Sequence, residues 1–312
     1  ATFKPTKTDD QRMKQFKIKV VVVLGVLVFL AGCSSDEEIT EPFVYRIPVV
    51  VHVVHNGQDV GEGPNISQAQ VQSQIDVLNE DFRRISGTNG FDSNGVDTEI
   101  EFYMAMTDPD GNILLEPGID RYNGGRFIWP TGLATSIDSQ LKPATIWDPN
   151  RYFNIWTVNF GGFVGRNLLG YAQFPSDSGL PGLNVNEGSA LTDGVVVGYK
   201  YFGSAEKGNF PDLNETYNLG RTTTHEVGHW LGLRHIWGDG DCLVDDFCND
   251  TPNSDEPNFS CETHISCGTL DMIENYMDYT EDSCMSLFTQ DQKERMVQVL
   301  ENSPRRSTLY KR

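Results

Sequence analysis

Basic residues are scarce in this chain of 312 residues. Lysine and arginine together number 24 against 44 aspartates and glutamates, which gives a formal net charge of −20 and an isoelectric point near 4.6. Such a surface would repel the phosphates of a nucleic acid, and no basic cluster beyond the N-terminal segment offsets it. The composition therefore excludes nucleic-acid binding as a main function and is typical of a globular protein with a solvated acidic surface.

Long hydrophobic runs are lacking too, apart from a short one near the start. The apolar run at 20–32 is too short to span a bilayer. It follows the basic segment 13–19 and ends in Leu30-Ala31-Gly32-Cys33, which resembles a bacterial lipoprotein signal. We therefore expect cleavage before Cys33 and lipid on its sulfur. A plain secretory signal with a chance cysteine is the alternative.

The segment after this cysteine predicts where the mature chain works. Residues 34–38, Ser-Ser-Asp-Glu-Glu, resemble the acidic export tag of some bacterial surface lipoproteins. We expect an exported lipoprotein held in the outer membrane, at the cell surface, by lipid on Cys33. The expected organisation is an upstream artefact at 1–12, a signal peptide at 13–32, a lipidated tether at 33–46, a main domain at 47–304 and a tail at 305–312.

Histidine is scarce as well, and half of it lies in one stretch. Three of the six histidines fall within residues 225–235, which fit the pattern H-E-x-x-H-x-x-G-x-x-H. On a helix, His225 and His229 project from one face, close enough to share one Zn²⁺. Gly232 permits a sharp turn with positive φ, which ends the helix and brings His235 back as a third ligand.

Glu226 sits next to that face, where it can take a proton from the attacking water rather than bind the metal. One alternative is a short helix whose histidines pack or contact solvent. Another is a zinc enzyme of the gluzincin type, with a carboxylate ligand such as Asp250. The glycine and the third histidine favour a hydrolytic zinc site, because three neutral nitrogens leave one position open.

A second motif, Asn275-Tyr276-Met277-Asp278-Tyr279, resembles the Met-turn of the metzincin metalloproteases. Residues 225–237, the acidic stretch 238–252 and residues 275–289, which contain this motif, make the chain similar to the pappalysin family, in its bacterial cytophagalysin branch. A weaker similarity extends from Ile47 to the last predicted helix. The resemblance covers nearly the whole chain that follows the signal.

The pappalysin resemblance implies specific roles for two residues. Met277 would form an apolar floor beneath the three histidines, and Tyr279 would donate a hydrogen bond to the reacting oxyanion. It also implies an endopeptidase acting on proteins or peptides, with a deep cleft between an upper subdomain to about residue 233 and a lower subdomain at 234–304.

Calcium and side-chain specificity are further implications of the resemblance. Members of the family bind calcium near the cleft, and the oxygen-rich run here contains Asp239, Asp241, Asp245, Asp246, Asp250 and Thr251. The last four are the expected ligands. Their spacing does not fit an EF-hand, so solvated loop acids are the alternative. Members that cleave before lysine or arginine carry an aspartate in the specificity pocket at the position of Ser283. The serine leaves a basic preference open, with Glu281 or Asp282 as substitutes.

Cysteines are few, and five of the six follow the third histidine. An exported chain permits disulfides, which would brace a long irregular region. The resemblance implies the pairs Cys242–Cys267 and Cys261–Cys284. Cys248 is then either free or a replacement for Cys242 in the first pair. A second zinc at these cysteines is the alternative that an oxidising compartment disfavours.

Hydrophobic patterning predicts an α/β (α+β) fold, in which a twisted mixed sheet with two main helices precedes an irregular lower region. The β-branched and alternating segments predict strands at 47–55, 99–105, 153–158 and 194–199. The last of these is expected to be an edge strand that aligns a substrate by backbone pairing. The segments 107–130 and 175–193, rich in glycine and proline, are expected to be loops that wall the cleft.

Three helix starts are predicted from capping residues. Ser67 is expected to cap the first helix, and Thr289 to open the last one through about Glu301. The helix of the histidine motif is expected to begin near Arg221, with Thr222 or Thr223 as its cap.

The function that the sequence predicts is a zinc-dependent endopeptidase in which Glu226 assists the attack of water. The alternative from a different class is an inactive surface lipoprotein that binds protein or glycan on the same scaffold. The intact Glu226 argues against it, because loss of this base is the simplest route to an inactive zinc protein.

Overall fold

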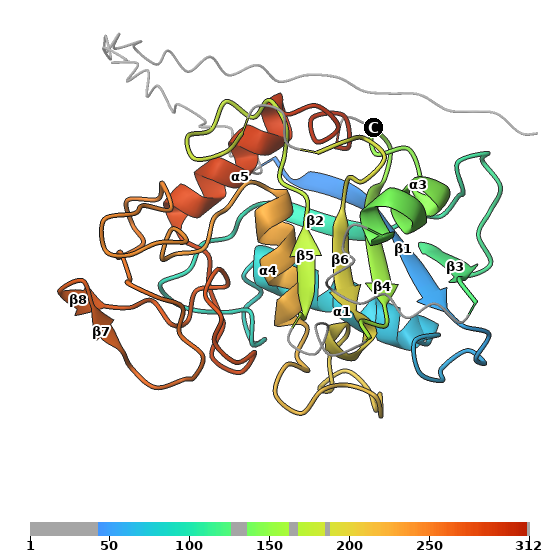
Figure 1. Ribbon diagram of the computed structural model, residues 1–312, viewed down its shortest axis with the longest axis horizontal. Helices are drawn as coiled ribbons and strands as arrows, with labels where there is room; N and C mark the ends of the chain where they lie inside the picture. Colours follow the sequence, from blue (N-terminus) through green and yellow to red (C-terminus); the bar gives the residue numbers. More distant parts are fainter. Residues whose placement is uncertain (1–42, 126–135, 162–167, 185–187, 311–312) are drawn as a thin grey trace, which may run out of the picture. The chain divides into compact units, whose positions relative to one another are not determined.

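The computed structural model describes residues 43–125, 136–161, 168–184 and 188–310. The predicted signal, Cys33 and most of the tether lie outside them. Figure 1 shows the elements in sequence colours. Their bounds are β1 Tyr45–His55, α1 Gln68–Phe82, β2 Ile100–Met104, β3 Ile119–Asn123, η2 Ile137–Leu141, α3 Lys142–Thr145, β4 Phe153–Val158, β5 Gly170–Ala172, β6 Val195–Gly198, η4 Tyr199–Tyr201, α4 Arg221–Trp230, β7 Ile265–Ser266, β8 Thr269–Leu270 and α5 Gln290–Asn302.

A mixed sheet forms the centre of the fold, in the order β2-β1-β4-β6-β5. The long strand β1 pairs in parallel with β2 through its first half, with β3 through its second half, and with β4 on its other side. β4 and β6 are parallel, whereas β5 is antiparallel to β6. The predicted α/β class with a mixed sheet is confirmed.

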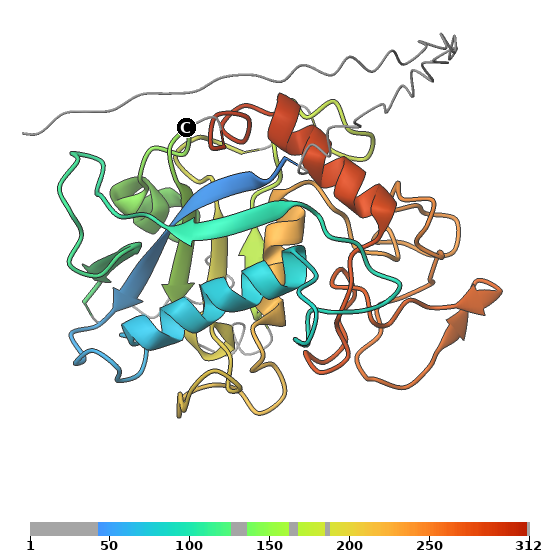
Figure 2. The same ribbon diagram turned by 180° about the vertical axis from the view of Figure 1, so that it is seen from behind.

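The two faces of the sheet are both covered, which explains why β1 reads as a nearly continuous apolar run. Val49, Val51 and Val53 face a large core shared with α1, α4 and α5. Val54 instead faces a smaller core with Trp156 and residues of the η2 segment. Figures 1 and 2 show α1 and α3 on opposite sides of the sheet.

Two predictions about the sheet were wrong. The strand at 194–199 is β6, which lies between β4 and β5 and is fully buried, so it is not an edge. The edge is β5, whose three residues are too few to show a period-2 pattern. The segment 107–130 contains β3 rather than loop alone, because pairing with the second half of β1 overrides its polar sequence.

Local capping signals predicted two helix starts correctly. Ser67 accepts a hydrogen bond from the Gln70 amide at the start of α1. Thr289 forms a capping box with Gln292 at the start of α5. Each cap joins residues three positions apart, which is why the sequence reveals it.

The predicted threonine caps of α4 were wrong. The N-cap is Gly220, in a left-handed conformation with φ of 87°. The carboxylate of Asp282 accepts hydrogen bonds from the Leu219 amide (2.7 Å) and the Arg221 amide (3.3 Å). A carboxylate from a distant segment thus satisfies amides that a local hydroxyl would otherwise accept.

Residues 231–289 contain little regular structure, and two disulfides brace them. Cys242 is bonded to Cys267, and Cys261 is bonded to Cys284. Cys248 is a buried free thiol, and burial raises its pKa. Among the described residues, no helix is both long and apolar enough to cross a membrane.

Gly232 ends α4 with φ of 91°, as the sequence predicted. The Gly232 amide donates to the His229 carbonyl and the Leu233 amide to the Gly228 carbonyl, which together form a Schellman motif. An added Cβ would lie 2.8 Å from Cγ2 of Val299, so the position is closely packed as well as left-handed.

We therefore expect Gly232→Ala to destabilise the fold more than Gly111→Ala does. Gly111 has a similar φ of 89° but open space around it. An alanine held in the left-handed conformation should lower the free energy of unfolding of both variants by about 1–2 kcal/mol. Overpacking against Val299 should lower that of Gly232→Ala by about 1–3 kcal/mol more. Denaturant unfolding of the two variants measures the difference. Equal losses would show that packing at this turn does not matter.

A candidate metal centre beside an open cavity

Three imidazoles converge at the end of α4. His225 and His229 lie on the helix, and the turn at Gly232 brings His235 towards them. One ligand atom of each lies within 4.8 Å of the others, and Nε2 of His229 is 3.0 Å from Nε2 of His235. The structure therefore brings together the three histidines that the sequence singled out.

The other ring nitrogen of each histidine faces an oxygen. Nδ1 of His225 donates to the Tyr276 carbonyl (2.7 Å), and Nδ1 of His229 donates to the Leu233 carbonyl (2.8 Å). Nδ1 of His235 donates to the carboxylate of Asp239. These partners assign the protons to Nδ1, so every Nε2 presents a lone pair to the same point.

This donor set fits a zinc ion. Two nitrogen lone pairs 3.0 Å apart repel each other unless a cation lies between them. Burial keeps His225 and His229 neutral, since it lowers the pKa of His229 to about 3 and that of His225 well below its usual value. Three neutral imidazoles with oxygen partners on their second nitrogens are typical of catalytic zinc sites.

Sequence reasoning missed Asp239 as the partner of His235. Arg234 also reaches this carboxylate, at 3.4 Å, and the two groups lower its pKa. Asp239 was counted only among the acidic loop residues. Its spacing of four residues from His235 was the signal that could have revealed it.

Glu226 lines a cavity of about 460 Å³ that opens to solvent next to His225. Burial raises the pKa of its carboxyl to about 8. Gly170 of β5 permits this placement, because a Cβ there would lie 2.9 Å from Cγ of Glu226. The carboxyl group therefore lies between the metal centre and the edge strand.

Met277 and Tyr279 flank the histidines. Met277 is fully buried, and its sulfur packs so closely on α4 that a Cβ at Gly228 would lie 2.4 Å away. The ring of Tyr279 is centred 4.8 Å from that of His235 and 5.5 Å from that of His225. Burial, with the charge of Glu226, raises the pKa of Tyr279 to about 12, so its phenol keeps its proton at neutral pH.

A buried polar cluster under the first turn of α4 was not predicted. Thr224 donates to the carboxylate of Asp81 (2.6 Å), and Arg221 approaches the other oxygen of Asp81 at 3.3 Å. Both charged side chains are almost inaccessible to solvent. The cluster ties α4 to α1, and no local pattern could reveal it, since its members come from distant segments.

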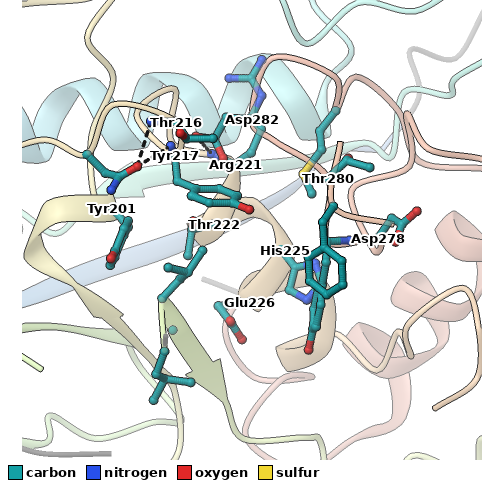
Figure 3. A pocket seen from close by; sticks show the side chains of 17 residues that line it. Tyr201, Thr216, Tyr217, Arg221, Thr222, His225, Glu226, Asp278, Thr280 and Asp282 are labelled. Carbon is teal, nitrogen blue, oxygen red and sulfur yellow. Dashed lines mark hydrogen bonds between the residues drawn. The ribbon is translucent and has the colours of Figure 1, made fainter. Parts of the chain in front are cut away.

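The cavity wall contains Asp282 but not Ser283. Figure 3 shows Asp282 and Arg221 towards one end of the lining group, with His225 and Glu226 towards the other. Asp282 is 2% exposed and its Oδ1 has no hydrogen-bond partner, whereas Ser283 is exposed and near Cys261. No lining residue comes from the described parts of 107–130 and 175–193, and residues 126–130 and 185–187 lie outside the described part of the chain.

The acidic loop does not gather the four residues expected to bind calcium into one cluster of side chains. Among the described residues, the only other close group is Asp255, His264 and Asp271. Asp246 is buried and accepts a hydrogen bond from Thr251, whereas Asp245 and Asp250 are exposed. Calcium binding stays a prediction.

Comparison with known proteins places this geometry in a family. The family model Peptidase_M43, described as Pregnancy-associated plasma protein-A, matches residues 136–301, just over half of the chain. An extracellular metalloprotease of Colletotrichum graminicola is 32% identical over 258 residues, which cover 80% of this chain and 74% of that protein.

Solved structures agree with this assignment. A structure of mirolysin in complex with compound 9 is 39% identical, with a TM-score of 0.71, and the match covers 86% of this chain and 97% of that one. Mature mirolysin of Tannerella forsythia with a cleaved peptide is 38% identical, with a TM-score of 0.69, over 87% and 97% of the two chains. This chain therefore belongs to the pappalysin family of metzincin metalloproteases and is a metalloendopeptidase.

Proposed function

We propose that this chain hydrolyses peptide bonds with one zinc ion held by Nε2 of His225, His229 and His235. The observation that carries the proposal is the convergence of three lone pairs beside the buried carboxyl group of Glu226. Zinc bound there supplies Lewis acidity for attack on a peptide carbonyl. The sequence prediction of a zinc endopeptidase depends on the same residues.

Glu226 serves as the base in this proposal. Burial alone would keep this carboxyl group largely protonated at neutral pH, but the charge of a bound zinc ion would favour the carboxylate. The carboxylate would take a proton from the attacking water and then deliver it to the leaving amine. The neighbouring edge strand β5 aligns the substrate through its free backbone groups, in place of the buried strand β6. An extended peptide paired with β5 lies next to Gly170, the residue that contacts the Glu226 side chain.

Removing the base should abolish turnover without removing the metal. We expect Glu226→Gln to retain one zinc per chain and to lower kcat by on the order of 10²–10⁴-fold, because the amide cannot accept the proton. Zinc analysis measures the metal content, and a peptide-cleavage assay measures kcat. Glu262→Gln, at an exposed site outside the cavity, is the control. Full activity in Glu226→Gln, or in zinc-depleted wild type, would refute the proposal.

Tyr279 is assigned to the oxyanion of the transition state. Its phenol is protonated at neutral pH and lies beside two of the histidines. Removal of one hydrogen-bond donor to an oxyanion lowers kcat by on the order of 10²–10³-fold. We therefore expect Tyr279→Phe to lower kcat by this factor and to retain zinc. Tyr217→Phe, elsewhere in the cavity wall, should lose little. An unchanged kcat in Tyr279→Phe would remove the residue from the mechanism.

Side-chain specificity is assigned to Asp282 instead of Ser283. The Asp282 carboxyl is buried in the cavity wall with one oxygen unpartnered, so it can receive a basic side chain from the residue after the scissile bond. Burial raises the pKa of Asp282 to about 6, which leaves it largely ionised above neutral pH.

We expect Asp282→Asn to reduce the preference for lysine over methionine after the scissile bond by on the order of ten- to a hundredfold, the value of a hydrogen bond to a charged group. Ser283→Ala should leave the preference unchanged. Paired peptides that differ at this one position provide the measurement. If both variants keep the wild-type ratio, the carboxyl group of Asp282 does not select the substrate.

The location of the enzyme is a separate proposal that rests on sequence. We infer that Cys33 carries lipid and holds the enzyme in the outer membrane. A buried acyl chain contributes about 0.8 kcal/mol per CH₂, so several chains anchor a protein firmly. Cys33→Ser should therefore move the protein from the detergent phase to the aqueous phase. If wild type and Cys33→Ser partition in the same way, the lipid anchor is excluded. Protease treatment of intact cells tests separately whether the enzyme is exposed at the cell surface.

A further inference from the structure

The segment that follows α5 contains a fully buried arginine. Arg306 is inaccessible to solvent, and its Nη1 lies 2.6 Å from each carboxylate oxygen of Asp193. Burial opposes ionisation of Asp193, but the charges of Arg306 and Arg305 hold the pKa of its carboxyl below the usual value. Both partners are therefore charged, although almost no water reaches them.

Arg306 also contacts the last residue of the zinc-site helix. Its Nε donates to the Trp230 carbonyl (3.2 Å), and its guanidinium carbon lies 4.0 Å from the centre of the Trp230 ring. Trp230 in turn donates from Nε1 to Asp193 (3.0 Å). The three side chains form a closed group around the end of α4.

The same guanidinium reaches the edge strand. Nη2 of Arg306 lies 3.4 Å from the carbonyl of Gln173, the residue after β5. Asp193 comes two residues before β6. One side chain thus joins the end of α4 to two strands of the sheet.

A second arginine stabilises the turn that follows. Arg295 of α5 donates from Nε to the carbonyl of Gly232 (2.9 Å). The last carbonyls of a helix have no partner within the helix, and cationic side chains there satisfy both their hydrogen bonds and the helix dipole. Arg306 and Arg295 therefore hold the backbone between His229 and His235.

We propose that Arg306 is a positioning residue for catalysis, which sets the geometry of His229 and His235 by holding the end of α4. The inference rests on the proposed zinc site. Trp230 adjoins His229, so a shift of its carbonyl moves a ligand directly. Because Arg306 also holds the residue after β5, it fixes the distance between the metal centre and the strand that aligns the substrate.

The test compares Arg306→Lys with Arg305→Lys. Arg305 contacts the same carboxylate and Ser176 but makes no hydrogen bond to α4, so it is a matched control. A lysine at 306 retains the charge near Asp193 but cannot also reach the carbonyls of Trp230 and Gln173. We expect hydrogen exchange of the amides at 231–235 in zinc-free protein to become several-fold faster in Arg306→Lys only.

In the zinc-loaded enzymes, kcat of Arg306→Lys should fall on the order of tenfold with little change in KM. Arg305→Lys should match wild type. The inference is overturned if Arg306→Lys lowers only the melting temperature and leaves both the exchange and kcat per bound zinc unchanged.

A third variant covers the case in which Arg306→Lys does not fold. Trp230→Phe retains an aromatic ring but replaces the indole and removes its hydrogen bond to Asp193, so it should show the same changes to a smaller extent. Wild-type exchange and kcat in that variant would overturn the inference. If the wild type shows no zinc-dependent cleavage, the proposed function is refuted instead. The hydrogen-exchange result is independent of that outcome, because it is measured on zinc-free protein.

Discussion

The site depends on one constraint, which is that each imidazole has a single lone pair and the fold must decide which nitrogen keeps it. The structure assigns the proton to Nδ1 in all three histidines by placing an oxygen there. These oxygens come from the Met-turn at Tyr276, the helix end at Leu233 and the loop at Asp239. Three segments must therefore be in register before the three Nε2 atoms can meet, so the site exists only in the folded chain.

Buried charges maintain that register at both ends of α4. Asp81 and Arg221 lie under its first turn, and Asp193 and Arg306 lie around its last residue. Buried ion pairs of this kind add little to the free energy of folding, because desolvation offsets the attraction between the charges. Their geometry, however, is strict, since an unpaired charge in the interior is very costly. The helix is thus held by groups that favour one position over all others, and a hydrolytic site needs such precision more than additional stability.

Local patterns predicted those parts of the fold that depend on neighbouring residues. The strand 153–158 and the caps Ser67 and Thr289 are set by alternation or by contacts over three positions. The errors share a different cause. The N-terminal amides of α4 are satisfied by Asp282 from a distant segment, and β6 is interior only because the short strand β5 returns antiparallel to it. Pairing and capping between distant segments leave no periodic signal in the sequence.

The sequence alone predicted which three histidines come together, because the spacing of His225 and His229 and the turn at Gly232 are properties of a single helix and its end. The pappalysin resemblance followed from the same segment and from the Met-turn. Only the tertiary structure decided that Asp239 orients the third histidine, that Asp282 rather than Ser283 faces the cavity, and that Arg306 holds the helix end. Each of these contacts depends on how loops and termini pack around α4, and the physical reason is burial: a charged group in the interior must find its partner wherever the fold brings one within reach.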